Sequence, residues 1–142
     1  MQPSVIDTVA KYFYFLSLDE QISFSASLKA LAELRSNDWL EERDRSRWVQ
    51  VLAKWKPKLK QLRGRQWRDF AQAPGFSLSE NVDINAWSGF LSSGEASEIE
   101  AVLLSQILGF SDEDIASGLQ VTIGTVRYRV GRGLRHLGGY LE

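Results

Sequence analysis

Apolar residues recur along most of the chain at intervals of three and four, and no stretch of strict alternation is long enough to build a sheet. A first helix is predicted after Ser4, whose hydroxyl can cap it. Ser17 and Glu20 have the spacing of a capping box, which predicts a second helix through about Leu34. Phe24, inside that helix, is expected in the core. The pattern predicts an all-α protein.

A third helix is predicted from Asn37 or Asp38 onward, with Pro57 inside it. Proline has no amide hydrogen and clashes with the preceding turn, so it should divide this helix near Lys56. The apolar residues of the predicted helix again have helical spacing: Trp48, Leu52, Trp55, Leu59 and Leu62.

The amino-acid composition then changes between residues 74 and 94. This stretch is rich in Gly, Ser and Asn and poor in charge, which predicts a linker. Its large apolar residues, Trp87 and Phe90 among them, indicate that the linker docks partly on a domain. We expect two small helical units: an N-terminal helical domain over 1–73 and a C-terminal domain over 95–142.

The C-terminal domain has the spacing of a helix-turn-helix. Ser111 with Asp114 three positions later marks the start of a short helix, and Thr122 can cap a longer helix after a tight connection. On a wheel at 100° per residue, the apolar residues of the longer helix share a sector of about 80°; they are Ile123, Val126, Val130, Leu134, Leu137 and Leu141. The opposite face and its flanks carry threonine, tyrosine and arginine, which suits a recognition helix in the major groove of DNA.

The run SDEDIASGLQVTIGTVRYRVGRGLRHL, residues 111–137, resembles region four of bacterial sigma factors of the sigma-70 class, especially the compact extracytoplasmic-function type. The resemblance covers about a third of the chain, from about Glu95 to Leu137. It implies recognition of the -35 promoter element and contact with the polymerase flap. By position, the DNA-binding candidates are Thr122, Thr125, Arg127, Tyr128 and Arg129, with Arg132 and Arg135 expected at phosphates.

The sequence departs from the family pattern in three respects. Gln120 occupies the turn position usually filled by glycine and must adopt a left-handed conformation. Gly131 and Gly133 lie inside the recognition helix, each at a cost of about 1 kcal/mol relative to alanine. Tyr128 stands where the family usually has a small residue. The alternative for the whole unit is a packing element with a solvated arginine face, or a protein-binding surface.

The N-terminal half resembles sigma region two only faintly, through residues 48–54 (WVQVLAK) and 27–31 (SLKAL). A basic run follows, with nine Lys and Arg and no acid between Arg45 and Arg68. Its cations can neutralise phosphate or meet an acidic partner, whereas Trp55 has the spacing of a buried residue. The candidates for phosphate or partner contact are Lys54, Lys58, Arg63 and Arg65.

Composition bears on which functions are open to the chain. The 142 residues carry 17 basic and 18 acidic side chains, a net charge of -1 that disfavours nucleic acid at first sight. The balance is uneven, however: residues 1–73 have thirteen basic and nine acidic residues, and four arginines lie close together between Arg127 and Arg135. Local potential rather than net charge decides binding. With no cysteine and one histidine, we expect no metal, no cofactor and no enzymatic activity.

The leading hypothesis is a cytoplasmic bacterial transcription regulator, sigma-factor-like, that binds promoter DNA through its helix-turn-helix. No apolar run has the roughly 18 residues of a membrane span, and no secretory signal is expected from the N-terminal sequence. RNA polymerase or an anti-sigma-like regulator is an expected partner. The alternative is a degenerate sigma-like adaptor that binds a protein partner without recognising DNA.

Overall fold

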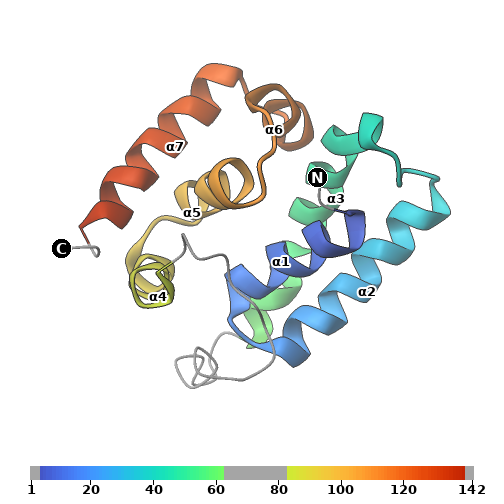
Figure 1. The fold of residues 1–142 in the computed structure, drawn as a ribbon, viewed down its shortest axis with the longest axis horizontal. Helices are drawn as coiled ribbons and strands as arrows, with labels where there is room; N and C mark the ends of the chain where they lie inside the picture. The colour runs from blue at the N-terminus through green and yellow to red at the C-terminus, as the bar shows by residue number, and fades with distance from the viewer. Residues whose placement is uncertain (1–3, 63–82, 140–142) are drawn as a thin grey trace.

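The computed structural model describes residues 4–62 and 83–139, and all regular structure within these ranges is helical (Figure 1). The predicted all-α class is therefore confirmed. In chain order the elements are α1 (Val5–Ser17), α2 (Glu20–Ser36), η1 (Glu42–Asp44), α3 (Arg45–Trp55), η2 (Lys56–Leu62), α4 (Ile84–Ser93), α5 (Ala96–Val102), η4 (Leu103–Ile107), α6 (Asp112–Leu119) and α7 (Ile123–Gly138).

Short polar side chains begin the first two helices, though not always at the predicted residue. Ser4 caps α1 as predicted, because its hydroxyl accepts from the Asp7 amide at 3.1 Å. The predicted capping box at Ser17 is wrong. Asp19 caps α2 instead, since its carboxylate accepts from the amides of the first turn, and the Ser17 hydroxyl donates back to a carbonyl of α1.

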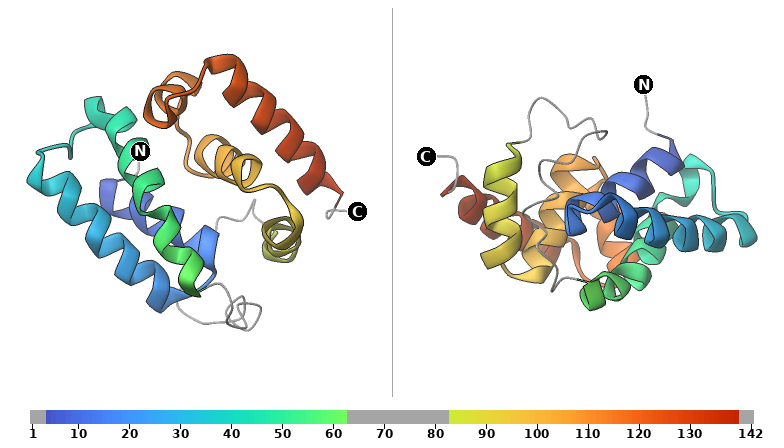
Figure 2. Two further views of the ribbon diagram at one scale, coloured as in Figure 1. Left: turned by 180° about the vertical axis from the view of Figure 1, so that it is seen from behind. Right: turned by 90° about the horizontal axis from the view of Figure 1, so that it is seen from below.

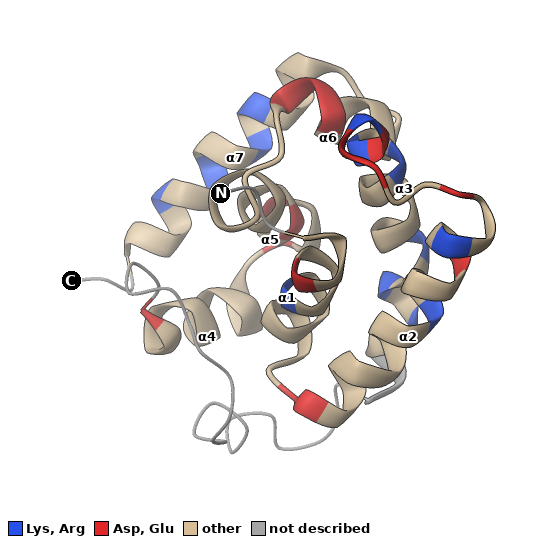
Figure 3. Cartoon of the chain, turned by 45° about the vertical axis from the view of Figure 1, so that its right-hand side comes forward, with Lys and Arg blue, Asp and Glu red and all other residues tan. Residues whose placement is uncertain are grey.

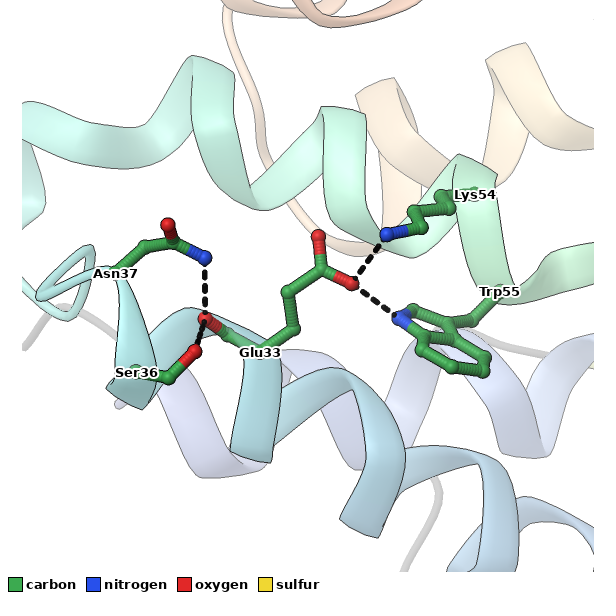
Figure 4. A network of polar contacts seen from close by, with 5 residues as sticks. All are labelled: Glu33, Ser36, Asn37, Lys54 and Trp55. Atoms are coloured by element: carbon green, nitrogen blue, oxygen red, sulfur yellow. Dashed lines mark hydrogen bonds and ion pairs between the residues drawn. The ribbon is translucent and has the colours of Figure 1, made fainter.

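The predicted start of the third helix is also wrong. Asn37 and Asp38 end α2 rather than begin α3: the Asn37 side-chain amide donates to the Glu33 carbonyl at 2.9 Å (Figure 4), and Asp38 has a left-handed φ of 59°. The chain reaches Arg45 through the short η1 turn before α3 begins. The division at Pro57 is confirmed, since α3 ends at Trp55 and the chain continues as the 3₁₀ helix η2.

The helices form two groups, α1–α3 and α4–α7, that lie side by side (Figures 1 and 2). The described part of the 74–94 segment is the helix α4, capped by Asp83. Its Trp87 and Phe90 are fully buried, and the Trp87 indole donates to the Phe15 carbonyl of α1 at 2.7 Å. One continuous hydrophobic core thus runs through both groups.

The second helix shows how strictly helical geometry sorts residues between core and solvent. Ile22, Ala26, Ala30 and Leu34, spaced by four, form its buried stripe. Phe24 lies two positions from Ile22 and Ala26, which places it on the opposite side of the helix. The expectation that Phe24 belongs to the core is therefore wrong: it is 65% exposed.

Helix α5 and its π-helical continuation η4 run through the middle of the molecule. Apolar residues of this segment are buried on several sides, and they include Ile99, Ala101, Val102, Leu103 and Leu104. A helix without an exposed face belongs in the interior of a fold. The segment ends where the Leu108 amide bonds the Leu103 carbonyl and Gly109 takes a left-handed φ of 76°, which turns the chain toward α6.

Polar contacts and a close helix crossing join the two groups. The Tyr12 hydroxyl of α1 donates to the buried Glu100 carboxylate of α5 at 2.8 Å, and the Lys56 ammonium lies 3.4 Å from the same carboxylate. Where α6 crosses α3, a Cβ on Gly118 would stand 2.5 Å from the Cβ of Val49. Only glycine permits this approach, so residue 118 sets the distance between the groups.

Helix α7 packs on α4, α5 and α6. At Gly133 it approaches so closely that an added Cβ would stand 2.5 Å from Val102 and 3.1 Å from the Glu98 carbonyl. Because of this crossing, the buried face of α7 differs from the one that the helical wheel predicts. Val126 is buried as predicted, but Leu134, expected on the inward side, is 40% exposed while its neighbour Gly133 is buried.

The two glycines inside α7 should respond to alanine in opposite ways. Gly131 has open space where a Cβ would be, so Gly131→Ala should raise the free energy of unfolding by roughly 0.5–1 kcal/mol through helix propensity. Gly133→Ala should lower it by about 1–2 kcal/mol, because overpacking exceeds that gain. Urea unfolding followed by circular dichroism measures both. Equal stability of the two variants would contradict the close crossing.

Stability should fall at alkaline pH through Tyr12. Burial raises the pKa of its phenol well above that of an exposed tyrosine, and the charge of Glu100 raises it further. The unfolded chain therefore loses this proton near pH 10 while the folded chain retains it, so the free energy of unfolding declines as pH rises past about 10. Tyr12→Phe should flatten the slope measured by urea unfolding between pH 8 and 11, whereas Tyr128→Phe, at an exposed position, should not. Identical slopes in both variants would refute this assignment.

Candidate nucleic-acid interface

The connection between α6 and α7 forms a tight turn of the helix-turn-helix kind. Ser111 caps α6 by accepting from the Asp114 amide at 3.1 Å, as predicted. Gln120 ends α6 with φ 60° and ψ 46°, so the expected left-handed conformation at this non-glycine position is confirmed. The Val121 amide then bonds the Ala116 carbonyl at 3.0 Å, which fixes the direction in which α7 begins.

Thr122 caps α7, as its position predicted. Its hydroxyl accepts from the Thr125 amide at 3.0 Å and lies 2.9 Å from the Thr125 hydroxyl. The first turn of α7 contains no acidic residue. The positive end of the helix dipole is therefore not neutralised locally, which favours an anion such as a phosphate group near this end.

The four arginines of α7 differ in their ion-pair partners. The Arg127 Nε atom lies 3.0 Å from the Asp112 carboxylate, and the Arg132 Nε atom lies 3.3 Å from the Glu98 carboxylate. Arg129 and Arg135 have no ion pair within the described part of the chain. Figure 3 shows the basic residues along α7 and the acidic first turn of α6 beside them. Two guanidinium groups are thus paired and two are open to an external anion.

Tyr128 is the most exposed large hydrophobic side chain of this face, at 61%. The Arg132 Nη1 atom donates to its hydroxyl at 3.2 Å, and the guanidinium lies 5.8 Å from the ring centroid. The hydrogen bond and the electrostatic interaction with Tyr128, followed by the charge of Glu98, raise the pKa of Arg132. Arg132 therefore remains charged at any physiological pH.

The basic candidates of the N-terminal half lie elsewhere in the molecule. Lys54 pairs with Glu33 of α2 at 2.8 Å, and the Trp55 indole donates to the same carboxylate oxygen at 3.0 Å (Figure 4). Lys58 lies beside Lys29, whose hydrogen bonding and like charge lower the pKa of Lys58. These residues face α2, on the opposite side of the molecule from α7 (Figure 1), so the structure does not bring them together with the α7 arginines. Arg63 and Arg65 lie outside the described residues.

The sequence did not predict two residues of this interface, Glu98 and Asp112. Both are acids on neighbouring helices, and each becomes a partner of an α7 arginine only when α5 and α6 pack beside α7. A partial signal was present for Asp112, because three consecutive acids begin α6. No local signal marks Glu98, since a carboxylate in an amphipathic helix is ordinarily solvated.

The arrangement defines the class of this part of the protein. A short helix, a tight left-handed turn and a longer capped helix with an exposed basic face constitute a helix-turn-helix of the nucleic-acid-binding type.

The comparisons with known proteins agree with this class. Residues 98–137 match the family described as sigma-70, region 4. The fold is similar to that of the sigma factor RpoE from Bartonella quintana, solved in complex with the anti-sigma factor NepR, with a TM-score of 0.70 and 20% identity over 96% of this chain and 91% of that one. No curated protein matches the chain significantly in sequence.

The C-terminal residues 98–137 are therefore a region 4 domain of the sigma-70 class, carried by a chain with the fold of a sigma factor. The resemblance predicted from the motif is confirmed for this segment, and the fold of the whole chain is similar to that of a sigma factor. Within the described residues, no helix is long and apolar enough to cross a membrane, and no three potential metal ligands cluster together.

Proposed function

We propose that this protein regulates transcription in the bacterial cytoplasm, without a catalytic step of its own, by binding promoter DNA through the exposed face of α7. The observation that carries the proposal is the capped, basic and solvent-facing helix that follows a helix-turn-helix connection. Helix α7 packs only on other helices of its own group among the main contacts of the fold. Its outward face is therefore accessible while the two groups remain together (Figure 2).

The residues of this face divide into two kinds of contact. Arg129 and Arg135 have no acidic partner in the described part of the chain, so their guanidinium groups suit phosphate oxygens or guanine. Arg127 is paired with a partly exposed carboxylate, an interaction of low free energy that DNA can replace. The cap of Thr122 and Thr125 orients the first turn, whose free amides suit a phosphate.

The modest charge of the chain indicates that DNA alone does not hold this protein on a promoter. With a net charge of -1 and two α7 arginines already paired, non-specific affinity for DNA should be low. RNA polymerase is the partner that we infer for promoter binding. The structural neighbour was solved with an anti-sigma factor, and an anti-sigma-like regulator is the second partner that we infer for this chain.

A specific observation favours a second candidate function. The carboxylates of Asp112 and Glu98 already occupy two of the four α7 guanidinium groups, and Gly131 weakens the helix that carries them. A sigma-shaped adaptor that binds another protein, without recognising DNA, needs no free arginines. In this second candidate function, a surface formed by both groups of helices, α1–α3 and α4–α7, binds the protein partner.

A direct test is titration of a randomised DNA duplex pool with the full chain at two salt concentrations. Promoter binding requires sequence enrichment together with a steep salt dependence. Arg129→Ala should weaken binding by roughly 1–3 kcal/mol, because a guanidinium contact to a base or a phosphate is lost. Fluorescence anisotropy with an enriched duplex measures the change.

Arg35→Ala is the matched control, since it removes the same charge from the last turn of α2, far from α7. It should leave affinity nearly unchanged. Equal affinity of wild type and Arg129→Ala would refute the assignment of this face. No enrichment at low salt, together with capture of a regulator but not of polymerase from a lysate, would favour the adaptor.

A further inference from the structure

Three side chains connect the interior of the region 4 domain to its exposed face. Glu98, on the central helix α5, is only 6% exposed. Its Oε2 atom lies 3.3 Å from the Arg132 Nε atom, and the Nη1 atom of the same guanidinium donates to the Tyr128 hydroxyl at 3.2 Å. A buried carboxylate, a half-exposed guanidinium and an exposed phenol thus form one chain of contacts.

The buried end of this chain restricts what Arg132 can do. A buried carboxylate that loses its cationic partner is left as an uncompensated charge, which destabilises a fold strongly. Arg132 therefore stays with Glu98 and does not swing out to a phosphate. By contrast, the Asp112 side chain that pairs with Arg127 is 31% exposed, so water can solvate it if DNA takes its partner.

The exposed end of the chain is oriented by the same contacts. An isolated surface tyrosine samples several rotamers, whereas Tyr128 is held by a hydrogen bond at its hydroxyl and by a guanidinium near its ring. Because the phenol oxygen accepts from Arg132, its own O–H remains to donate outward. The acceptors offered in the major groove are guanine O6 and N7, adenine N7 and thymine O4.

We infer that Tyr128 is a specificity-determining residue that donates its hydroxyl hydrogen to a base-edge acceptor, and that Arg132 is its positioning residue, anchored by Glu98. This inference rests on the proposed function, since it requires α7 to lie in a DNA groove. It changes the expected role of Arg132 from phosphate contact to support. The tyrosine stands at a position where the resembled family usually has a small residue, so it gives this protein a contact of its own.

The test uses the full chain and selection from a randomised duplex pool, followed by sequencing and anisotropy. Tyr128→Phe retains the ring and removes only the hydroxyl. It should lose the preference at one base pair, with affinity for the best duplex reduced about tenfold and affinity for duplexes changed at that pair nearly unaltered. Selection of the same sequence with the same affinity by Tyr128→Phe would overturn the inference.

Arg132→Gln separates positioning from phosphate contact. A positioning role predicts loss of preference at the same base pair, an unchanged salt slope, and little further loss when Tyr128→Phe is added. A phosphate contact predicts instead a salt slope lower by about one with the base preference retained, which would overturn the inference. Arg135→Gln is the matched control on the same face, and it should lower the salt slope and retain the preference.

Glu98→Gln tests the buried anchor, and it should reproduce the loss of preference seen in Arg132→Gln. If this variant or Arg132→Gln does not fold, as judged by circular dichroism, the exposed Tyr128→Phe variant still decides the matter. A wild-type chain that selects no sequence and binds no duplex at low salt would refute the proposed function and this inference with it. A wild-type chain that selects a sequence which Tyr128→Phe also selects refutes the inference alone.

Discussion

Two carboxylates on one buried helix connect the parts of this molecule. Glu98 and Glu100 project from α5 on different sides: Glu98 pairs with Arg132 of α7, and Glu100 accepts from Tyr12 of α1 and pairs with Lys56. A buried carboxylate is tolerated only when hydrogen bonds and a cation compensate its desolvation. Each carboxylate therefore requires its partners in one position, and together they define how the recognition helix and the N-terminal helices sit around α5.

The apolar contacts around α5 are shaped by close approaches as well as by burial. Gly118 lets α6 contact α3 at Val49, and Gly133 lets α7 contact α5 at Val102. Glycine is costly inside a helix in isolation, but here it allows dense packing on both sides of the helix-turn-helix. Gly133, which lowers the helix propensity of α7, is thus required for α7 to pack closely on α5.

The chemistry of the recognition face follows from this packing. Arg127 and Arg132 lie next to acids supplied by α6 and α5, whereas Arg129 and Arg135 remain open. The face is therefore less cationic than its sequence indicates, and the DNA specificity that we propose for it depends more on orientation than on charge. This balance supports the proposal that the protein acts together with a protein partner.

The sequence alone determined the helical class, the division at Pro57, the caps at Ser4, Ser111 and Thr122, and the family of the C-terminal domain. These are local properties, because a cap, a proline or a motif acts within a few residues of itself. The sequence predicted the wrong cap for α2, because Ser17 and Asp19 lie close together and each can cap this helix.

Tertiary structure decided which surface residues pair and which glycines are required. The exposure of Phe24 follows from the stripe that α2 turns toward the core. The partners of the α7 arginines come from residues 15 and 34 positions earlier in the chain, Asp112 and Glu98. Charge and packing act through space without regard to sequence separation, so only the folded chain determines where Tyr128 points and what holds it there.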